Sequence, residues 1–349
     1  MKRPKSVTIK EVAQLAGVAQ VTAARTLGGY GHVSAENRRR VLAAAEQLGY
    51  YADGVARSMV TRTTHTLGLV ISDIQNHFFA KIARAVADVA RQRGYALVLA
   101  NTDEDFDREQ EATRVLAEKR VDGLIVVPAS GAYPSHLDVL IRRHVPIVLL
   151  DRSVPDLGVD AIVVDNAAAA YRAIRQLTDL GHRRVGMITA SRTLMTSAAR
   201  VAGYRTALAE VGVHETSPWL RVAQHGQASA EAEARELLAL SEGQRPTAIF
   251  ATDSILTASA YRAIQMSGFA IPTTMSLIGF DDADWMSMVR PAITVVEQPV
   301  RELGERAAER LIGRIEGDDS PPQTVCLNTA LIVRGSCAPP ASEHTAMEP

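Results

Sequence analysis

The chain has 349 residues, of which 38 are Lys or Arg and 39 are Asp or Glu. At about 100–200 residues per domain, this length predicts two or three compact units. A hydrophobic fraction of 47% with 22% charge excludes fibrous and disordered chains. The first residues lack an apolar segment of signal-peptide length, and no window holds the ~18 apolar residues of a membrane span, so we expect a cytoplasmic protein. The two cysteines, Cys326 and Cys337, are too few for a disulfide framework and are expected to be free thiols.

Charge is distributed unevenly along the chain. Up to residue 62 there are 10 Lys and Arg against 4 Asp and Glu, which leaves 28 against 35 for the remainder. A basic N-terminal segment followed by an acidic body indicates a nucleic-acid contact in the basic segment. A solvated surface explains such an imbalance equally well, so the geometry of the segment has to decide.

Three short helices are predicted in the basic segment. Thr8 and Glu11 have the spacing of a capping box, and Gly17 ends the helix that they begin. A second helix is expected over about 19–27, and Ser34 caps a third. Two helices joined by so short a turn form a helix-turn-helix, whose second helix fits the major groove of DNA. The side chains expected to be buried are Ile9, Val12, Ala13, Leu15 and Ala16 in the first helix and Val41, Leu42, Ala45 and Leu48 in the third.

The pattern changes from Thr66 onward to apolar runs of strand length that alternate with amphipathic stretches of helical length. Such alternation predicts a parallel sheet covered on both faces, and it repeats after Asp165. The expected fold class is therefore α plus α/β: a three-helix helix-turn-helix head, a hinge, and a two-lobed, doubly wound α/β domain. Ligands of such sheets bind beyond the carboxyl ends of the strands, which here places the ligand in the cleft between the lobes.

Aromatic and polar side chains follow the predicted strands at those ends. Taken singly, each has an ordinary explanation as a core ring, a surface ion pair or a helix cap. Together they predict a polyol site, in which rings cover C–H edges and charged groups bind hydroxyls. The candidate residues are Phe78, Phe79, Asp151, Arg152, Arg200, Thr252, Asp281 and Gln298.

The segment from Thr8 through Tyr50 resembles the DNA-binding head of lac-repressor-family transcription regulators. The resemblance rests on VAQLAGVAQVTAARTL and HVSAENRRRVLAAAEQLGY, where turn, cap and basic residues all match in register. It implies a repressor that binds a pseudo-palindromic operator as a homodimer. We expect bases to be read by Gln20, Val21 and Arg25, phosphates to be contacted by Thr8, Thr22, His32 and Ser34, and Met59 to enter the minor groove from a hinge that is helical over 53–60 only on DNA.

Residues 66–335 resemble the type I periplasmic sugar-binding fold, which this family uses as its effector domain. They are similar to ribose-binding proteins at NHFF, LLDRS, TSAAR, IGFDD and VEQP. The resemblance implies that Phe78 and Phe79 enclose a sugar ring and that the polar candidate residues hold its hydroxyls. Thr252 stands where ribose binders have Asn, and His77 where they have Pro. The expected effector is therefore a pentose or a related polyol, acting as an inducer, and not necessarily ribose.

The expected domain limits follow from these patterns. They are 1–52 for the head, 53–65 for the hinge or linker, 66–163 with 293–322 for the first lobe, 164–292 with 323–337 for the second lobe, and 338–349 for a disordered tail. The chain is expected to cross between the lobes three times, near 163, 292 and 322.

Two other classes of protein compete with a regulator. An enzyme is disfavoured because the sequence has no Walker lysine loop, G-x-G-x-x-G, G-x-S-x-G or H-E-x-x-H motif. A periplasmic transport receptor would account for the body, but it needs an export signal and has no use for a basic helical head. No metal or cofactor is expected.

Overall fold

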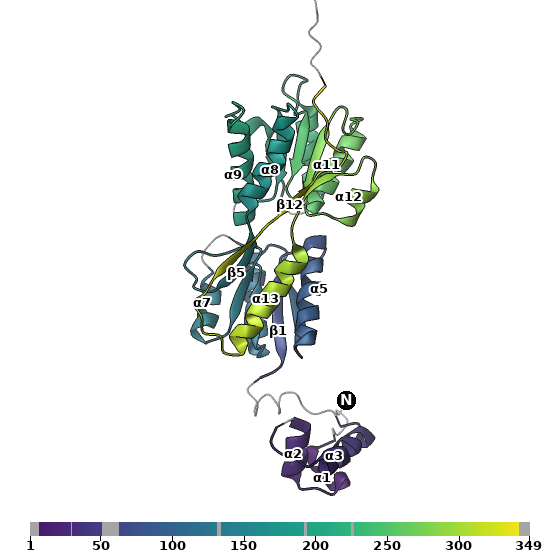
Figure 1. Ribbon diagram of the computed structural model, residues 1–349, viewed down its shortest axis with the longest axis vertical. Coiled ribbons are helices and arrows are strands. Elements are labelled where there is room, and N and C mark those ends of the chain that lie inside the picture. The colour runs from purple at the N-terminus through teal and green to yellow at the C-terminus, as the bar shows by residue number, and fades with distance from the viewer. Residues whose placement is uncertain are drawn as a thin grey trace, which may run out of the picture. The chain divides into compact units, whose positions relative to one another are not determined.

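The computed structural model describes residues 7–28, 30–50, 63–130, 134–191, 194–224 and 227–341. The chain divides into two compact units, residues 1–65 and 66–349 (Figure 1). Within the described residues, no helix is both long and apolar enough to cross a membrane. The predicted fold class is confirmed, and the two units are described in turn.

Three helices make up the first unit: α1 (Ile9–Ala16), α2 (Gln20–Gly28) and α3 (Ala35–Leu48). The predicted capping box is present, because Thr8 accepts from the backbone N–H of Glu11 while the Glu11 side chain reaches back to the Thr8 backbone. Ser34 caps α3 in the same manner, accepting from Asn37 N. Gly17 ends α1 in the left-handed conformation, with a φ of 63°. Caps and a glycine stop therefore set the lengths of the helices, as the sequence indicates.

Two leucines expected in the core of this unit are exposed instead. Leu15 is 47% and Leu42 is 51% exposed. Short helices that meet through alanines approach closely, so each buries only a narrow stripe and the flanking leucines face outward. The buried side chains are Val12, Ala13, Ala16, Ala23, Val41, Ala44 and Ala45.

The first lobe of the second unit is a parallel sheet of six strands in the order β11-β5-β4-β3-β1-β2. Its strands are β1 (Thr66–Ile71), β2 (Ala96–Asn101), β3 (Gly123–Val126), β4 (Ile147–Leu150), β5 (Asp160–Val164) and β11 (Thr324–Leu327). Its helices are α5 (His77–Gln92), α6 (Phe106–Glu118), α7 (Ser135–Arg142) and α13 (Val300–Ile315). Helices α5 and α13 lie side by side on one face (Figure 1), and α6 and α7 pack against each other.

The second lobe has the strand order β12-β10-β9-β8-β6-β7, in which only β12 runs antiparallel to its neighbour. Its strands are β6 (Val185–Thr189), β7 (Leu220–Val222), β8 (Ala248–Ala251), β9 (Ser276–Phe280), β10 (Thr294–Glu297) and β12 (Ala330–Ile332). Its helices are α8 (Asn166–Asp179), α9 (Met195–Ala209), the 3-10 turn Ser217–Trp219, α10 (Gln227–Ala239), α11 (Ser254–Met266) and α12 (Asp284–Met288). Helices α8 and α9 share one hydrophobic core, and α10 and α11 share another.

The strand pairings move two of the expected lobe limits. Strand β10 pairs with β9, so residues 294–297 belong to the second lobe and not to the first. Strand β11 pairs with β5, so residues 324–327 belong to the first lobe and not to the second. The chain therefore crosses between the lobes just after β10 and again between β11 and β12. The physical reason is that α13 packs on the first lobe, and the strand that follows it adds to the edge of that same sheet.

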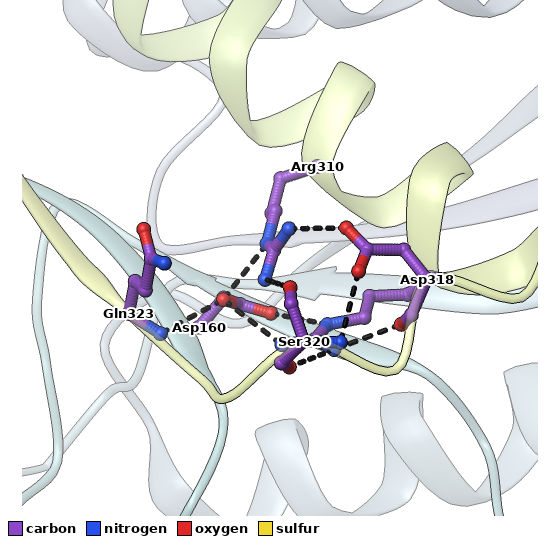
Figure 2. A network of polar contacts seen from close by, with 6 residues as sticks. Asp160, Arg310, Asp318, Ser320 and Gln323 are labelled. Atoms are coloured by element: carbon purple, nitrogen blue, oxygen red, sulfur yellow. Dashed lines mark hydrogen bonds and ion pairs between the residues drawn. The ribbon is translucent and has the colours of Figure 1, made fainter.

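A buried carboxylate ties α13 to this sheet edge. Asp160, 2% exposed at the start of β5, accepts from Arg314 Nε (2.7 Å) and from the backbone N–H of Gln323 (3.0 Å). Arg310 Nε lies 2.8 Å from the same carboxylate, and Asp318 completes the network shown in Figure 2. Burial acts to raise the pKa of Asp160, but the Arg314, Gln323 and Arg310 bonds outweigh it and leave this pKa lowered. Helix, connecting segment and strand are thus held at one buried charge.

Candidate functional site

Helix α2 of the first unit presents three of the predicted DNA-contacting side chains to solvent. Gln20, Val21 and Arg25 are exposed, Val21 by 61%, whereas Ala23 and Thr26 are buried. An exposed Val beside polar side chains suits the major groove, where apolar groups contact thymine methyls and amides bond to base edges. The roles of these three residues in reading bases stay predictions.

The residues predicted to contact phosphates differ in exposure and in whether their side-chain protons are already hydrogen-bonded. Thr8 Oγ1 donates to Glu11 Oε2 (2.8 Å), so the capping box already uses that proton. Ser34 Oγ accepts from a backbone N–H of α3 (3.4 Å), which leaves its own proton available to a phosphate. His32 is exposed and Thr22 is half-buried. Ser34 and His32 are therefore the better placed of the four.

The turn between α1 and α2 is held by a side chain from α3. Arg40 Nη2 donates to the Gly17 carbonyl at 3.4 Å, and a side chain at position 17 would collide with that guanidinium. This contact fixes the turn of the helix-turn-helix against the third helix. Met59 and the predicted hinge segment 53–60 lie outside the described residues.

In the second unit, the two predicted aromatic residues begin α5. Asn76 caps this helix by accepting from Phe78 N, which places Phe78 and Phe79 in its first turn. Their rings meet edge to face with centroids 5.0 Å apart, and both side chains are about 95% buried. Both line a small cavity between the lobes.

Asp151 and Arg152 follow β4 and line this cavity. Asp151 adopts a left-handed backbone with a φ of 66°, and both side chains are buried. Arg152 is clamped by Glu104, whose two carboxylate oxygens each accept a guanidinium nitrogen at 2.6 Å, and by the Pro128 carbonyl at 2.6 Å. Burial raises the pKa of Asp151. Burial also acts to lower the pKa of Arg152, but Glu104, Asp151 and Glu109 together outweigh it and leave this pKa raised. The sequence therefore identified the guanidinium but not the carboxylate that holds it.

Arg200, from α9, enters the cavity from the second lobe. Its Nε donates to Asn166 Oδ1 (2.7 Å), its Nη1 donates to the Thr252 carbonyl (2.5 Å), and its guanidinium lies 3.8 Å from the ring centre of Phe280. The Thr252 hydroxyl bonds to Thr189 Oγ1 at 3.2 Å. Thr252 thus positions Arg200 through its carbonyl, a role that the side-chain comparison with Asn did not predict.

Asp281 and Gln298 complete the second wall. Asp281 has a φ of 65° after β9, and Gln298 Nε2 donates to its Oδ1 at 2.7 Å. Burial raises the pKa of Asp281 to about 7, with Asp253 and Asp151 adding to the increase, while Arg200 and the Gln298 bond oppose it. Burial therefore destabilises the ionised form of Asp281. A ligand that donates hydrogen bonds to this carboxylate would stabilise the ionised form again.

All eight predicted effector-site residues line the same cavity of about 60 Å³. A larger space of about 520 Å³ adjoins it, and Asn76, Phe79 and Asp253 line both. Among the described buried side chains, three cavity-lining residues carry a polar atom without a hydrogen-bond partner: Asp151 Oδ1, Arg152 Nε and Gln298 Oε1. Buried polar atoms are rarely left unpaired, so these three are candidates for ligand contacts.

Side chains of the two lobes also contact each other directly. Ser254 Oγ, at the start of α11, donates to Asn76 Oδ1 at 3.3 Å. Asp284 Oδ1, on α12, lies 3.6 Å from His77 Nε2 and 3.5 Å from Lys81 Nζ on α5. The lobes therefore touch where the first residues of α5 and its cap meet α11 and α12.

Two residues that hold the arginines of the site are missing from the sequence prediction. Glu104 lies in an acidic run after β2 that reads as a solvated loop, and Asn166 lies beside the cap of α8. Their partners, Arg152 and Arg200, stand 48 and 34 positions away along the chain. Because both pairings depend on tertiary contacts, no local pattern marks either residue.

Comparisons with known proteins bear on both units. Residues 8–53 match the family model of bacterial regulatory proteins of the lacI family, and residues 174–337 match that of a periplasmic binding protein-like domain. The HTH-type transcriptional repressor PurR of Aliivibrio fischeri is 31% identical over 330 residues, covering 94% of this chain and 98% of the relative. The ribose operon repressor of Haemophilus influenzae is 31% identical over 329 residues, with the same coverage. The lac repressor dimer bound to operator and the anti-inducer ONPF has a TM-score of 0.83 at 25% identity, over 96% of this chain and all of that one.

Proposed function

The chain belongs to the lacI family of bacterial regulatory proteins and is a ligand-controlled, DNA-binding transcription regulator, and we propose that its ligand is a pentose or a closely related polyol. The observation that carries the proposal is the set of buried polar atoms without a hydrogen bond on Asp151, Arg152 and Gln298 around one small cavity. A sugar hydroxyl both donates and accepts, so neighbouring hydroxyls can satisfy a carboxylate, a guanidinium N–H and an amide oxygen together.

The remaining walls of the cavity support the same ligand class. Phe78 and Phe79 offer apolar ring surface to the C–H groups of a sugar ring. Asp281 and Arg200 face them from the other lobe. A ligand that touches both walls binds the closed cleft better than an open one, which is what control of a conformational equilibrium requires.

A thermal-shift screen tests the ligand class. Pentoses, pentitols, nucleosides and hexoses are added to the purified protein, and a ligand raises the melting temperature according to RT ln(1 + [L]/Kd). We expect the largest shifts from pentoses or pentitols, and their loss in Asp281→Ala. Stabilisation by hexoses alone, or an undiminished shift in Asp281→Ala, would contradict the proposed ligand.

The proposed DNA target is a pseudo-palindromic operator bound by a homodimer in the cytoplasm. A single helix-turn-helix contacts too few base pairs for selectivity, and two-fold symmetric subunits present paired recognition helices. The structurally similar lac repressor is a dimer bound to operator, which supports the proposal. We assign residues 53–65 to a hinge, with Met59 as its minor-groove wedge. Size measurement that finds a monomer with intact operator binding would contradict the dimer.

We propose that the sugar acts as an inducer that lowers operator affinity. Genes for sugar catabolism need release from repression when their substrate is present, and a repressor of a ribose operon is among the relatives. Operator titrations with and without the best pentose test this sign. Tighter operator binding in the presence of the sugar would identify a corepressor instead.

A further inference from the structure

Glu109 is a buried carboxylate next to the cleft that the proposed sugar site does not include. It lies in the first turns of α6 and is 1% exposed. Within the described part of the chain, its ion-pair partner is His136, whereas Arg152 interacts with it through charge alone, without an ion pair. A buried carboxylate without a strong cationic partner is costly, so its hydrogen bonds identify what it does.

One of those bonds holds a peptide group by its N–H. Glu109 Oε2 accepts from the backbone N–H of Ala129 at 2.5 Å. The carbonyl of the same peptide group, that of Pro128, accepts from Arg152 Nη1 at 2.6 Å. A single peptide plane therefore lies between Glu109 and Arg152, with its N–H on the carboxylate and its C=O on the guanidinium.

We propose that Glu109, oriented by His136, is a positioning residue that fixes this peptide and thereby places Arg152 for the effector. The carboxylate determines which way the Pro128–Ala129 peptide faces, because a flipped peptide would direct its N–H at the Arg152 guanidinium. Hydrogen bonds in such a chain also polarise one another, so the carboxylate makes the Pro128 carbonyl a stronger acceptor. Glu104 and this carbonyl hold the Nη atoms. Arg152 Nε makes no hydrogen bond and lies 3.4 Å from Asp151 Oδ2 as an ion pair.

His136 fixes the carboxylate in turn. Its Nε2 lies 2.8 Å from Glu109 Oε1, and its ring meets Phe106 edge to face at 5.3 Å. A carboxylate only accepts, so Nε2 carries the proton in this contact. The imidazole lies at the start of α7 and is 12% exposed. A chain of hydrogen bonds therefore leads from a partly exposed side chain, His136, through Glu109 and the peptide to Arg152 in the cavity wall.

The central experiment compares three variants on α6 by titration calorimetry with the best pentose from the screen. In Glu109→Ala the acceptor is lost, and we expect sugar affinity to fall about ten- to hundredfold, the loss typical when a residue that orients a metal ligand is removed. Glu109→Gln keeps an oxygen that can accept from Ala129 N–H, so its sugar affinity should lie between those of Glu109→Ala and wild type. Glu111→Ala is the matched control, since this carboxylate on the same helix pairs with exposed Arg114 and should leave sugar affinity unchanged. Operator affinity without sugar should stay at the wild-type value in all three.

A second measurement separates positioning from general damage to the fold. A single-deoxy pentose that lacks the hydroxyl bound by Arg152 should bind wild type more weakly than the parent sugar does. Glu109→Ala should bind the deoxy sugar and the parent sugar with equal affinity, because that variant has already lost the contact. Equal sugar affinity in Glu109→Ala and wild type, or equal deoxy penalties in both, would overturn the proposal.

The sugar measurements rest on the proposed function, so a third measurement does not use sugar. In a crystal structure of Glu109→Ala we expect the Pro128–Ala129 peptide to rotate and the contact from Arg152 Nη1 to Pro128 to lengthen. Should Glu109→Ala fail to fold, Glu109→Gln and His136→Phe are examined in the same way. Absence of sugar binding by wild type would reject the proposed ligand alone, whereas an unmoved peptide and Arg152 in the variants would reject the role of Glu109.

Discussion

Asp284 Oδ1 and Lys81 Nζ lie 3.5 Å apart and join α12 of the second lobe to α5 of the first. Both side chains are exposed, by 71% and 44%. His77 Nε2 stands 3.6 Å from the same carboxylate oxygen. The pair therefore joins the two lobes that enclose the proposed effector cavity, and it favours their closed arrangement.

We predict that Asp284→Asn weakens sugar binding slightly and in a salt-dependent manner. An exposed ion pair contributes about 0.2–1 kcal/mol, so affinity should fall by less than about fivefold. At 1 M salt, where the screening length is about 3 Å, variant and wild type should bind alike. Calorimetry at low and high salt measures both values. The control is Asp88→Asn, which removes ion pairs within α5 and none between lobes. A loss that persists at 1 M salt would show that Asp284 acts other than through its charge.

A second prediction concerns Asp281, whose folded-state pKa of about 7 lies above the ordinary value of 3.8. Between these values the folded protein binds a proton that the unfolded chain has released. Stability without ligand is therefore full below pH ~4 and falls as the pH rises through about 7, by an amount on the order of 4 kcal/mol for this group. Asp281→Asn removes that dependence.

We expect the stability advantage of Asp281→Asn over wild type to be larger at pH 8 than at pH 5, and its sugar affinity to be lost. Urea unfolding at pH 5 and pH 8 measures the first effect, and the thermal-shift screen measures the second. Asp151 and Asp253 also have raised pKa values through burial, so the difference between variant and wild type is the relevant quantity. Identical pH dependence in the two proteins would show that Asp281 is not a destabilised carboxylate.

The third prediction addresses the Asp160 network of Figure 2. Removing one partner from a buried ion pair typically costs about 3–5 kcal/mol, and Asp160→Ala leaves Arg314 and Arg310 facing a vacated carboxylate site. The pKa of Asp160 is lowered, so its contribution is present above pH ~4 and is lost as the pH falls through the folded-state value.

Urea unfolding at pH 7 should show that loss in Asp160→Ala, and the difference from wild type should shrink below pH ~4. Asp318→Ala provides the comparison, because this carboxylate meets Arg310 at the surface and is 39% exposed. A loss in Asp318→Ala as large as in Asp160→Ala would show that burial is not the reason for the effect.

Sequence patterns predicted the features that depend on residues close together along the chain, such as helix caps and the side chains that follow strand ends. Thr8 and Glu11 form their capping box because the pairing spans three positions, and Phe78 and Phe79 reach the cleft because a strand end and a helix cap precede them. The sequence predicted the second lobe for strand β11, whereas the strand belongs to the first. Its pairing with β5 joins residues about 160 positions apart, and no local pattern reveals such a pairing. Glu104 and Glu109 escaped prediction for the same reason: the guanidinium and the peptide that give them a role come from distant loops.

The last prediction separates base reading from phosphate contact in the first unit. Gln20 is exposed at the start of α2, where its amide can bond to a base edge, whereas Ser34 caps α3 and has a hydroxyl proton to donate. Gln20→Ala should change which operator bases are preferred, at ~1–3 kcal/mol per misread pair.

Ser34→Ala should instead weaken all DNA sites alike and cost about 0.5–2 kcal/mol of stability through loss of the cap. Binding to a library of operator variants, combined with unfolding of each protein, distinguishes the two outcomes. Arg38→Ala serves as the control, since it removes an exposed charge from α3 without disturbing the cap, and should reduce the salt dependence of binding without changing base preference. If Gln20→Ala keeps the wild-type base preferences, the exposed face of α2 is not the face that reads DNA, and the assignments of Val21 and Arg25 are wrong as well.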